Sequence, residues 1–406
     1  MASGQPPQNT ASAAPRWLGI IGSGQLGMLL CEAARGLDVR TMVLSDDPAA
    51  PAIYSADAVL VASMTDPRAL ADMIQQCATV TFEFEAVPDT TLDRLARAVA
   101  RSAISVHPGV DTLSLLKDKG RQKTWLRDNG LPTLPFILTD AGTTADDLRA
   151  GTIPTPLVQK TRQGGYDGKG VQILLHDADL ERLWPVPGLI EPALIDCTEV
   201  AVVVARDTQG SIQAFPPVSM AFDASLNAVS TVTYPAEVAP DIRAACADIA
   251  ERAVSALAAV GVFAVELFVS TQGEIFINEI SPRVHNAGHL TLTAFEHDQF
   301  EQHVRAVMGL PVAPVSARAD AAVMLNLLYD DSMQPAHTGQ PYSMQLESQS
   351  ALYWYGKTEA RSGRKMGHIT ALGESTEAAL ALAHAGLERI RQGDLNPTPI
   401  SARASA

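Results

Sequence analysis

The 406-residue sequence predicts an α/β protein of two or three domains, and three observations support this prediction. Short apolar strands alternate with helical stretches from Trp17 to Phe82, which is the pattern of a parallel, doubly wound sheet. Further along, two strands enclose a glycine-rich loop between Val158 and Leu175, and a proline-containing connector at Leu310–Arg318 precedes a last segment. A chain of this length usually holds two or three domains.

Composition and charge exclude several functional classes. Hydrophobic residues make up 47% of the chain and charged residues 18%, so the chain is globular. No apolar run approaches the ~20 residues that span a bilayer. The net charge of −15 argues against nonspecific binding of nucleic acid or anionic lipid. Residues 1–15 have neither the apolar core of a secretory signal nor the arginines of a transit peptide. We therefore expect a cytoplasmic protein with a flexible N-terminal tail and no nucleic-acid or membrane partner.

The first strand, Trp17–Ile21, runs directly into a GxGxxG motif at Gly22–Gly27, which a helical stretch follows. In this position such glycines let backbone N–H groups approach a phosphate at a helix N-terminus. Asp46 follows the second strand, where a dinucleotide-binding protein keeps an acid for the ribose. A dinucleotide-dependent oxidoreductase is therefore one hypothesis, and glycines that only form a tight turn are the alternative.

The most informative stretch is Val158–Val171, which places Lys160 on a strand, then four glycines and Lys169, then a second strand. A glycine-rich β-hairpin of this kind can fold over a polyphosphate, because its backbone N–H groups and the two lysines meet the negative charge. The stretch lacks the GxxxxGK[ST] pattern of a P-loop. A hairpin with ordinary turn glycines and no ligand is the alternative.

Two apolar strands around a short turn, Val262–Val269 and Glu274–Glu279, form another predicted hairpin. If the turn centres on Gln272–Gly273, Glu266 lies directly opposite Glu279. Two carboxylates that face each other inside a sheet repel and are poorly hydrated, and a hard cation between them relieves both problems. Oxygen ligands of this kind suit Mg²⁺ carried with a nucleotide. Two solvent-exposed edge carboxylates are the alternative.

Two further segments are suited to binding anions. Arg283, in Ser281–His289, offers a fixed charged fork for carboxylate or phosphate, and a surface arginine without a ligand is its alternative. His289 is as compatible with a structural role as with a catalytic one. In so acidic a protein, a cluster of basic residues beside glycines is a candidate anion site, with a solvated loop as the alternative. The cluster consists of Lys357, Arg361, Arg364 and Lys365.

Together these segments resemble the ATP-grasp superfamily and, within it, the N5-carboxyaminoimidazole ribonucleotide synthetases of purine biosynthesis. The resemblance rests on Gly22–Gly27, on GGYDGKG at Gly164–Gly170, on INEISPRVHNAGH at Ile277–His289 and on GRKMGH at Gly363–His368. It implies an ATP-grasp fold with an N-terminal Rossmann-like (pre-ATP-grasp) domain and a small C-terminal module that completes the substrate site. These domains would cover residues 16–114, 115–312 (with a lid at roughly 125–190) and 313–406, after the tail at 1–15.

The same resemblance implies a ligase that uses ATP and bicarbonate to carboxylate 5-aminoimidazole ribonucleotide through carboxyphosphate, giving ADP and phosphate. Its cofactors would be ATP and Mg²⁺, and it would form a homodimer. The hinge Glu191–Leu194 would read adenine, Glu199 would hold the ribose hydroxyls, and Arg283 would stabilise carboxyphosphate.

The full set of site residues implied by the resemblance falls into four groups. ATP would be bound by Lys119, Lys160, Gly165, Tyr166, Asp167, Gly168, Lys169, Gly170, Glu191, Pro192, Ala193, Leu194, Glu199, Asn278 and Glu279. Glu266 and Glu279 would ligate Mg²⁺. Tyr166, Arg283 and Lys357 would be catalytic. The ribonucleotide would be bound by Lys357, Arg361, Arg364 and Lys365.

Three positions depart from the family pattern, which usually has arginine at Gln163 and at Met28 and an Asn-x-His element where this chain has Met220–Asp223. Three alternatives for the function remain. A dinucleotide-dependent oxidoreductase would leave the glycine-rich hairpin and the facing acids unexplained. A non-catalytic nucleotide-binding regulator would need neither Arg283 nor the basic cluster. Another ATP-grasp carboxylate–amine ligase would differ only in its acceptor.

Overall fold

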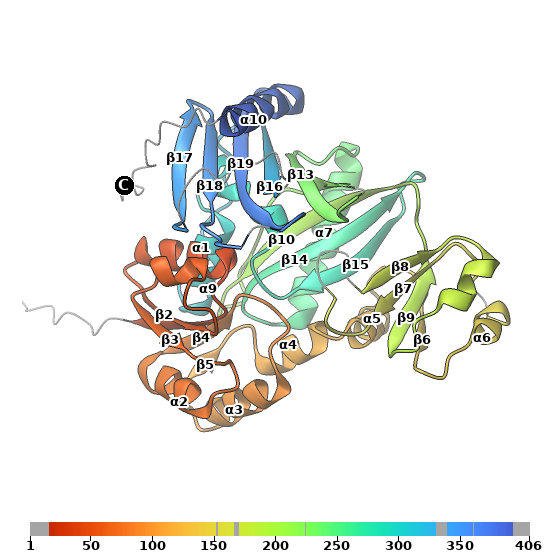
Figure 1. Cartoon of the computed structure of the whole chain (residues 1–406), viewed down its shortest axis with the longest axis horizontal. Helices are drawn as coiled ribbons and strands as arrows, with labels where there is room; N and C mark the ends of the chain where they lie inside the picture. Colours follow the sequence, from red (N-terminus) through yellow and green to blue (C-terminus); the bar gives the residue numbers. More distant parts are fainter. Residues whose placement is uncertain are drawn as a thin grey trace, which may run out of the picture.

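The computed structural model describes residues 16–151, 153–165, 170–223, 225–329, 339–359 and 361–392. Within these residues the chain forms three sheets, of five, ten and four strands. Figure 1 shows the five-stranded sheet and the four-stranded sheet at opposite ends of the molecule, with β14 and β15 of the ten-stranded sheet between them. None of the helices in the described part of the chain is long and apolar enough to cross a membrane.

The N-terminal sheet is parallel and has the strand order β3-β2-β1-β4-β5. Alternate residues of β1 point to opposite faces, so Leu18 and Ile20 pack with one helix layer and Ile21 with the other. This arrangement confirms the predicted doubly wound sheet. Its strands are β1 (Trp17–Ile21), β2 (Arg40–Ser45), β3 (Ala58–Val61), β4 (Thr79–Phe82) and β5 (Ser105–Val106). Its helices are α1 (Gln25–Arg35), η1 (Pro51–Tyr54), α2 (Pro67–Gln76) and α3 (Asp89–Ala100).

Two helices lead from this sheet to a small antiparallel one with the strand order β6-β9-β7-β8. Asp118 caps the second of these helices by accepting from the Arg121 N–H, and it also pairs with Arg162 at the end of β7. The same carboxylate therefore begins a helix and joins it to the small sheet. The elements are α4 (Val110–Leu116), α5 (Lys119–Asp128), β6 (Ile137–Thr139), α6 (Ala145–Arg149), β7 (Leu157–Thr161), β8 (Val171–Leu174), η2 (Asp177–Arg182) and β9 (Gly188–Pro192).

The large sheet runs without interruption from the middle of the chain into the C-terminal segment, in the order β15-β14-β10-β12-β13-β16-β19-β18-β17, with β11 beside β10. The link is the antiparallel pair β13–β16, in which Val232 lies opposite Met324. Its strands are β10 (Cys197–Arg206), β11 (Ile212–Ala214), β12 (Val218–Asp223), β13 (Ala228–Tyr234), β14 (Gly261–Ser270), β15 (Ile275–Ser281), β16 (Ala321–Leu328), β17 (Tyr342–Glu347), β18 (Ser350–Trp354) and β19 (Lys365–Gly373). Its helices are α7 (Pro240–Leu257), η3 (Asn286–Gly288), α8 (Thr291–Ala294), α9 (Gln299–Val307) and α10 (Thr376–Arg391).

The core joins the N-terminal sheet to the large one. Strand β10 alternates, so that Val200 and Val202 pack under α7 while Ala201 and Val203 face the opposite side. On that opposite side α9 packs against the sheet, and α1 of the N-terminal domain packs against α9. Burial of α1 in this shared core places the GxGxxG loop next to the C-terminal strands (Figure 1).

Candidate active site

The GxGxxG loop in this chain holds one of the protein's own carboxylates. The Gly24 N–H, at the start of α1, donates to Glu83 Oε2 over 2.5 Å. A Cβ added at Gly24 would lie 3.3 Å from Glu83 Cδ and would overlap the nearer carboxylate oxygen. Burial raises the pKa of Glu83 to about 7, an effect that the Gly24 N–H and the charges of Lys357 and Arg283 oppose. The glycines therefore allow the close approach of Glu83 to the helix N-terminus.

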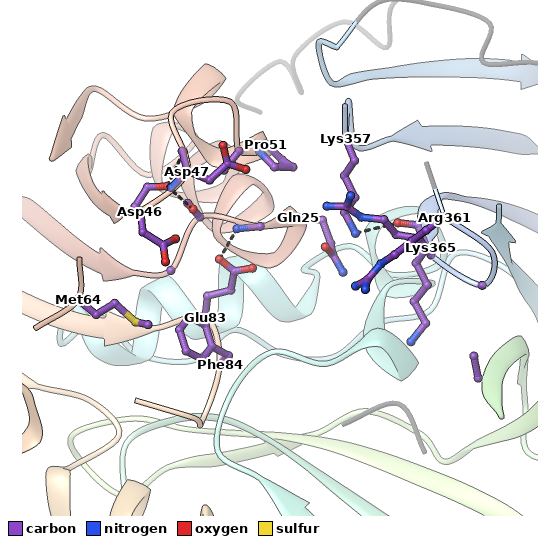
Figure 2. A pocket seen from close by; sticks show the side chains of 18 of the residues that line it. Gln25, Asp46, Asp47, Pro51, Met64, Glu83, Phe84, Lys357, Arg361 and Lys365 are labelled. Atoms are coloured by element: carbon purple, nitrogen blue, oxygen red, sulfur yellow. Dashed lines mark hydrogen bonds between the residues drawn. The ribbon is translucent and has the colours of Figure 1, made fainter. Parts of the chain in front are cut away.

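A cavity of about 500 Å³ opens beside this loop and is lined by residues of both ends of the chain. Figure 2 shows Lys357, Arg361 and Lys365 on one side of it and Asp46 and Asp47 on the other, with Gln25 and Glu83 between. The structure thus brings the four predicted ribonucleotide-binding residues together on one wall, since Lys357, Arg361, Arg364 and Lys365 all line the cavity. A basic wall facing a polar one suits a ligand with an anionic group at one end and hydroxyl groups at the other.

Main-chain bonds fix the basic wall. The Tyr329 N–H donates to the Arg364 carbonyl, and the Gly363 N–H donates to the Tyr329 carbonyl, so the turn before β19 is attached to the end of β16. Lys357 Nζ donates to the Lys365 carbonyl over 2.8 Å. Gly363 has a φ of +75°, which favours glycine at this turn.

The β14–β15 hairpin carries the two acids that the sequence places opposite each other, and Glu266 indeed pairs with Glu279. The assumed turn geometry is wrong, however. Near the turn Val269 lies opposite Ile275, so the hairpin centres on Gln272, and a β-bulge at Asn278 then shifts the pairing by one residue. Without the bulge Asn278 would face Glu266. Bulges near active sites commonly redirect side chains in this way.

The two acids differ in their partners. Lys119, from α5, pairs with the Glu279 carboxylate, while His285 Nε2 lies 3.2 Å from Glu266 Oε1. Burial and the negative charges of Glu279 and Glu199 raise the pKa of Glu266. Burial would also raise the pKa of Glu279, but Lys119 outweighs it and the pKa is lowered. The hairpin therefore holds two carboxylates that repel each other, of which Glu279 pairs with Lys119 and Glu266 contacts His285.

This pair fits Mg²⁺ bound together with a nucleotide. Within the described residues no group of three or more histidine, cysteine, aspartate or glutamate side chains is arranged to hold a metal ion by itself. Mg²⁺ in nucleotide sites commonly binds one or two carboxylates and completes its shell with phosphate oxygens and water. Glu266 and Glu279 would supply those protein ligands.

A second lysine, Lys160 on β7, reaches the same hairpin. Its Nζ donates to Asn278 Oδ1 over 2.7 Å and also pairs with Glu191. The Glu191 carboxylate, whose side chain is 1% exposed, is shared with Lys123 at 2.9 Å. The Glu191 side chain therefore pairs with two lysines, while its backbone lies opposite Val158 in the sheet. Glu199, on β10, is near Lys160, and burial raises its pKa to about 7.

Arg283 lies two residues after β15 and contacts Glu85, which lies two residues after the cavity-lining Glu83. Its guanidinium makes a two-pronged contact with Glu85, with Nε 2.5 Å from Oε2 and Nη2 3.3 Å from Oε1. The charge of Arg283 opposes the upward pKa shifts of Glu266 on the hairpin side and of Glu83 on the cavity side. One cation thus acts on the acids of both sites.

Comparisons with known proteins agree with this geometry. The chain matches models of the ribonucleotide synthetase pre-ATP-grasp domain at residues 16–117, the ATP-grasp domain at 124–300 and the phosphoribosylaminoimidazole carboxylase C-terminal domain at 322–382. The N5-carboxyaminoimidazole ribonucleotide synthase of Brucella melitensis is 36% identical over 361 residues, which cover 87% of this chain and 95% of that protein. The chain belongs to the N5-carboxyaminoimidazole ribonucleotide synthase family.

Solved structures of this family share the fold. The Thermotoga maritima synthetase superposes with a TM-score of 0.79 at 34% identity, covering 92% of this chain and 98% of that one. The Aspergillus clavatus synthase in complex with ADP and 5-aminoimidazole ribonucleotide gives a TM-score of 0.79 at 26% identity, covering 93% and 99%. The predicted ATP-grasp fold and the ligase class are confirmed. Family membership excludes the oxidoreductase alternative, and Glu83 explains the glycines that suggested it.

Most of the remaining residues that the sequence analysis singled out are either outside the described part of the chain or packed in the core. The loop residues Tyr166, Asp167, Gly168 and Lys169 lie outside the described residues, as does the tail at 1–15. His289 is fully buried, with its Nδ1 3.3 Å from Gln299 Nε2 and its ring against His368, so its packing is structural. The departures from the family pattern lie partly in the core: Met28 and Met220 are buried there, and Gln163 Nε2 donates to Asp118 over 3.4 Å.

Three residues of the site were missed by sequence reasoning: Glu83, Glu85 and Lys123. The signal for the two acids was available, because they follow β4 at the carboxyl edge of a parallel sheet, where ligands bind in such folds. Lys123 lies one helical turn after Lys119 on α5, so both lysines point from the same face.

Proposed function

We propose that the chain catalyses the ATP- and bicarbonate-dependent carboxylation of the exocyclic amine of 5-aminoimidazole ribonucleotide, with ADP and phosphate as the other products. The observation that carries this proposal is that Arg283, two residues after the strand with Glu279, contacts Glu85, which lies two residues after Glu83 in the lining of the basic-walled cavity. A reaction that makes an unstable anion at one site and consumes it at another needs a fixed cation between the two.

The cavity is the proposed ribonucleotide site. The 5′-phosphate would meet Lys357 and Arg364, because charge-assisted contacts from guanidinium and ammonium groups are the strong ones for phosphate. The sugar and the base would then lie toward Gln25 and Glu83, which line the middle of the cavity. Arg361 and Lys365 would add to the same positive wall.

ATP is proposed to lie between the four-stranded sheet and the β14–β15 hairpin. Lys119 and Lys160 reach this space from α5 and β7, and both contact hairpin residues. They would meet the phosphates together with the loop from Gly165 to Gly170. Glu199 would hold the ribose hydroxyls, and the backbone of Glu191–Leu194 would contact adenine.

The chemistry follows from these positions. A bicarbonate oxygen attacks the γ-phosphorus of ATP, ADP leaves, and carboxyphosphate forms. Carboxyphosphate then breaks down to phosphate and CO₂. The amine attacks the carbon of CO₂, and the proton that the amine loses passes to the phosphate. Arg283 would hold the carboxyphosphate anion, and Lys357 would orient the ribonucleotide so that its amine faces that anion. Mg²⁺ bound at Glu266 and Glu279 would neutralise charge on the ATP phosphates.

An ADP-release assay tests this proposal. We expect release to require both bicarbonate and 5-aminoimidazole ribonucleotide, and the carboxylated ribonucleotide to accumulate in equal amount. A thermal-shift scan should show stabilisation by ATP with Mg²⁺ and by the ribonucleotide, because ligands that bind only the folded state raise its melting temperature. Release driven by a different amine, with none for the ribonucleotide, would contradict the proposed acceptor.

The proposal also includes Mg²⁺ dependence, a homodimeric state and a cytoplasmic location without nucleic-acid or membrane partners. Chelation with EDTA should abolish ADP release, and added Mg²⁺ should restore it. Sedimentation should give twice the mass of one 43.0 kDa chain. A monomer in sedimentation would refute the homodimer.

A further inference from the structure

The donors of Arg283 are unequally used. A guanidinium has five N–H groups in a fixed plane. In this chain Nε and Nη2 donate to Glu85, and Nη1 donates to the Val284 carbonyl over 3.2 Å. Among the described residues these three contacts leave one N–H on each terminal nitrogen. Two donors on adjacent nitrogens match the two oxygens of a carboxylate or a bicarbonate.

Glu85 comes from a different part of the fold than the arginine it holds. It follows β4 of the N-terminal domain, whereas Arg283 follows β15 of the large sheet. The two side chains are 27% and 16% exposed, so the contact is largely withdrawn from solvent. Burial would raise the pKa of Glu85, but the charge and hydrogen bonds of Arg283 outweigh it and the pKa is lowered. The pair therefore stays ionised at neutral pH.

The neighbourhood explains why Arg283 needs such a partner. Glu279 and Glu266 both attract its charge, so a guanidinium released from Glu85 would be drawn toward the hairpin acids. There it would occupy the carboxylates proposed for Mg²⁺ and turn its free donors away from the cavity. A two-pronged contact with Glu85 prevents this, because it fixes both the place and the plane of the guanidinium.

We propose that Glu85 is a positioning residue for bicarbonate: it holds Arg283 so that its two remaining N–H groups bind the carboxylate oxygens of bicarbonate and of carboxyphosphate. This inference rests on the proposed carboxylation. It assigns to Glu85 no contact with substrate, only an action through Arg283.

The test is the KM for bicarbonate in Glu85→Gln, measured by ADP release at saturating ATP and ribonucleotide. Glutamine has the same size but cannot accept two charge-assisted bonds. Because misplacement of a binding group by about 1 Å can cost up to ~100-fold, we expect the KM for bicarbonate to rise about tenfold or more. The KM values for ATP and for the ribonucleotide should change less than about threefold. Glu85→Asp, which keeps the charge, should recover part of the loss.

Two controls separate this role from a purely structural one. Glu301→Gln removes a similar partly buried carboxylate that contacts Arg305 over 2.8 Å on α9, and it should leave the KM for bicarbonate unchanged. In an Arg283→Lys background, Glu85→Gln should add little further loss, because residues that act together are not additive. Equal, independent losses in the two backgrounds would overturn the proposal.

A tether between domains predicts a different result. In that case Glu85→Gln would lower the melting temperature while the KM for bicarbonate stayed at the wild-type value, and the positioning role would be wrong. If Glu85→Gln does not fold, the melting temperature and the KM for bicarbonate are compared in Glu85→Asp instead. Failure of the proposed function is distinguishable, because the wild-type enzyme itself would then show no bicarbonate requirement.

Discussion

The substitution Gly24→Ala tests whether the GxGxxG loop serves Glu83 or a bound phosphate. Gly24 has a φ of −74°, which alanine adopts without strain, so the cost comes only from the added methyl group. That methyl would lie 3.3 Å from Glu83 Cδ and overlap Oε1, so the carboxylate must move and its bond from the Gly24 N–H is lost. Because Glu83 is 8% exposed, it stays poorly hydrated after moving. A hydrogen bond to a charged group is worth about 1.5–3 kcal/mol, so we expect Gly24→Ala to lower the free energy of unfolding by about 2–3 kcal/mol.

Urea unfolding at pH 8, where Glu83 is ionised, measures this loss. Gly36→Ala is the matched control at the other end of α1, since its φ is −64° and its new methyl would meet nothing closer than 3.4 Å. It should change stability by less than about 0.5 kcal/mol. In a Glu83→Ala background, Gly24→Ala should cost little, because the group it displaces is gone. A stable Gly24→Ala protein with only a raised KM for the ribonucleotide would refute the reasoning and show that the glycine serves the substrate phosphate.

Four other expectations follow from the site. Glu279→Gln should abolish ADP release in a folded protein, because a neutral amide binds Mg²⁺ poorly; near-normal release would contradict the metal role. Arg364→Ala should raise the KM for the ribonucleotide about ten- to a hundredfold and leave the KM for ATP nearly unchanged, and Arg364→Lys should partly restore the KM for the ribonucleotide. An equal rise in both KM values would contradict the assignment of Arg364 to the ribonucleotide. Lys123→Met should lower the free energy of unfolding by about 3–5 kcal/mol, because the buried Glu191 carboxylate loses one of its two lysine partners. An unchanged free energy in urea unfolding would show that Lys160 alone neutralises Glu191. Folding raises the pKa of Glu83 from 4.5 to about 7, so the native state holds the extra proton and the free energy of unfolding falls as pH rises through this window. Glu83→Gln should reduce that fall by about 3 kcal/mol. An unchanged dependence of the free energy of unfolding on pH would rule out the raised pKa of Glu83.

The hairpin of facing acids shows how far sequence reasoning reaches. Apolar strands around an assumed Gln272–Gly273 turn predicted the pairing of Glu266 with Glu279, and the pairing is correct although the turn centres on Gln272. The bulge at Asn278 was not predicted, although it is what brings Glu279 opposite Glu266. Strand pairing follows a period of two that can be counted along a chain, whereas an extra residue depends on which arrangement the surrounding packing favours.

The acids after β4 show the opposite case. Glu83 and Glu85 are only two residues apart in the sequence, yet they contact partners from distant parts of the chain, Gly24 and Arg283. No local pattern indicates that one caps a glycine loop and the other orients an arginine. Those contacts exist only once the N-terminal sheet has packed against the large one through α1 and α9.

The sequence by itself determined the parallel N-terminal sheet, the family, and the residue types that meet phosphate and metal, because strand period, glycine position and charge are local properties. The tertiary structure decided what each of these residues touches. In the folded chain the glycine motif binds the Glu83 carboxylate, and Glu191 pairs with both Lys123 and Lys160. The basic cluster and the N-terminal loop line the same cavity. The physical reason is that a buried charge must find a partner, and the partner it finds depends on which elements the core brings within hydrogen-bonding distance.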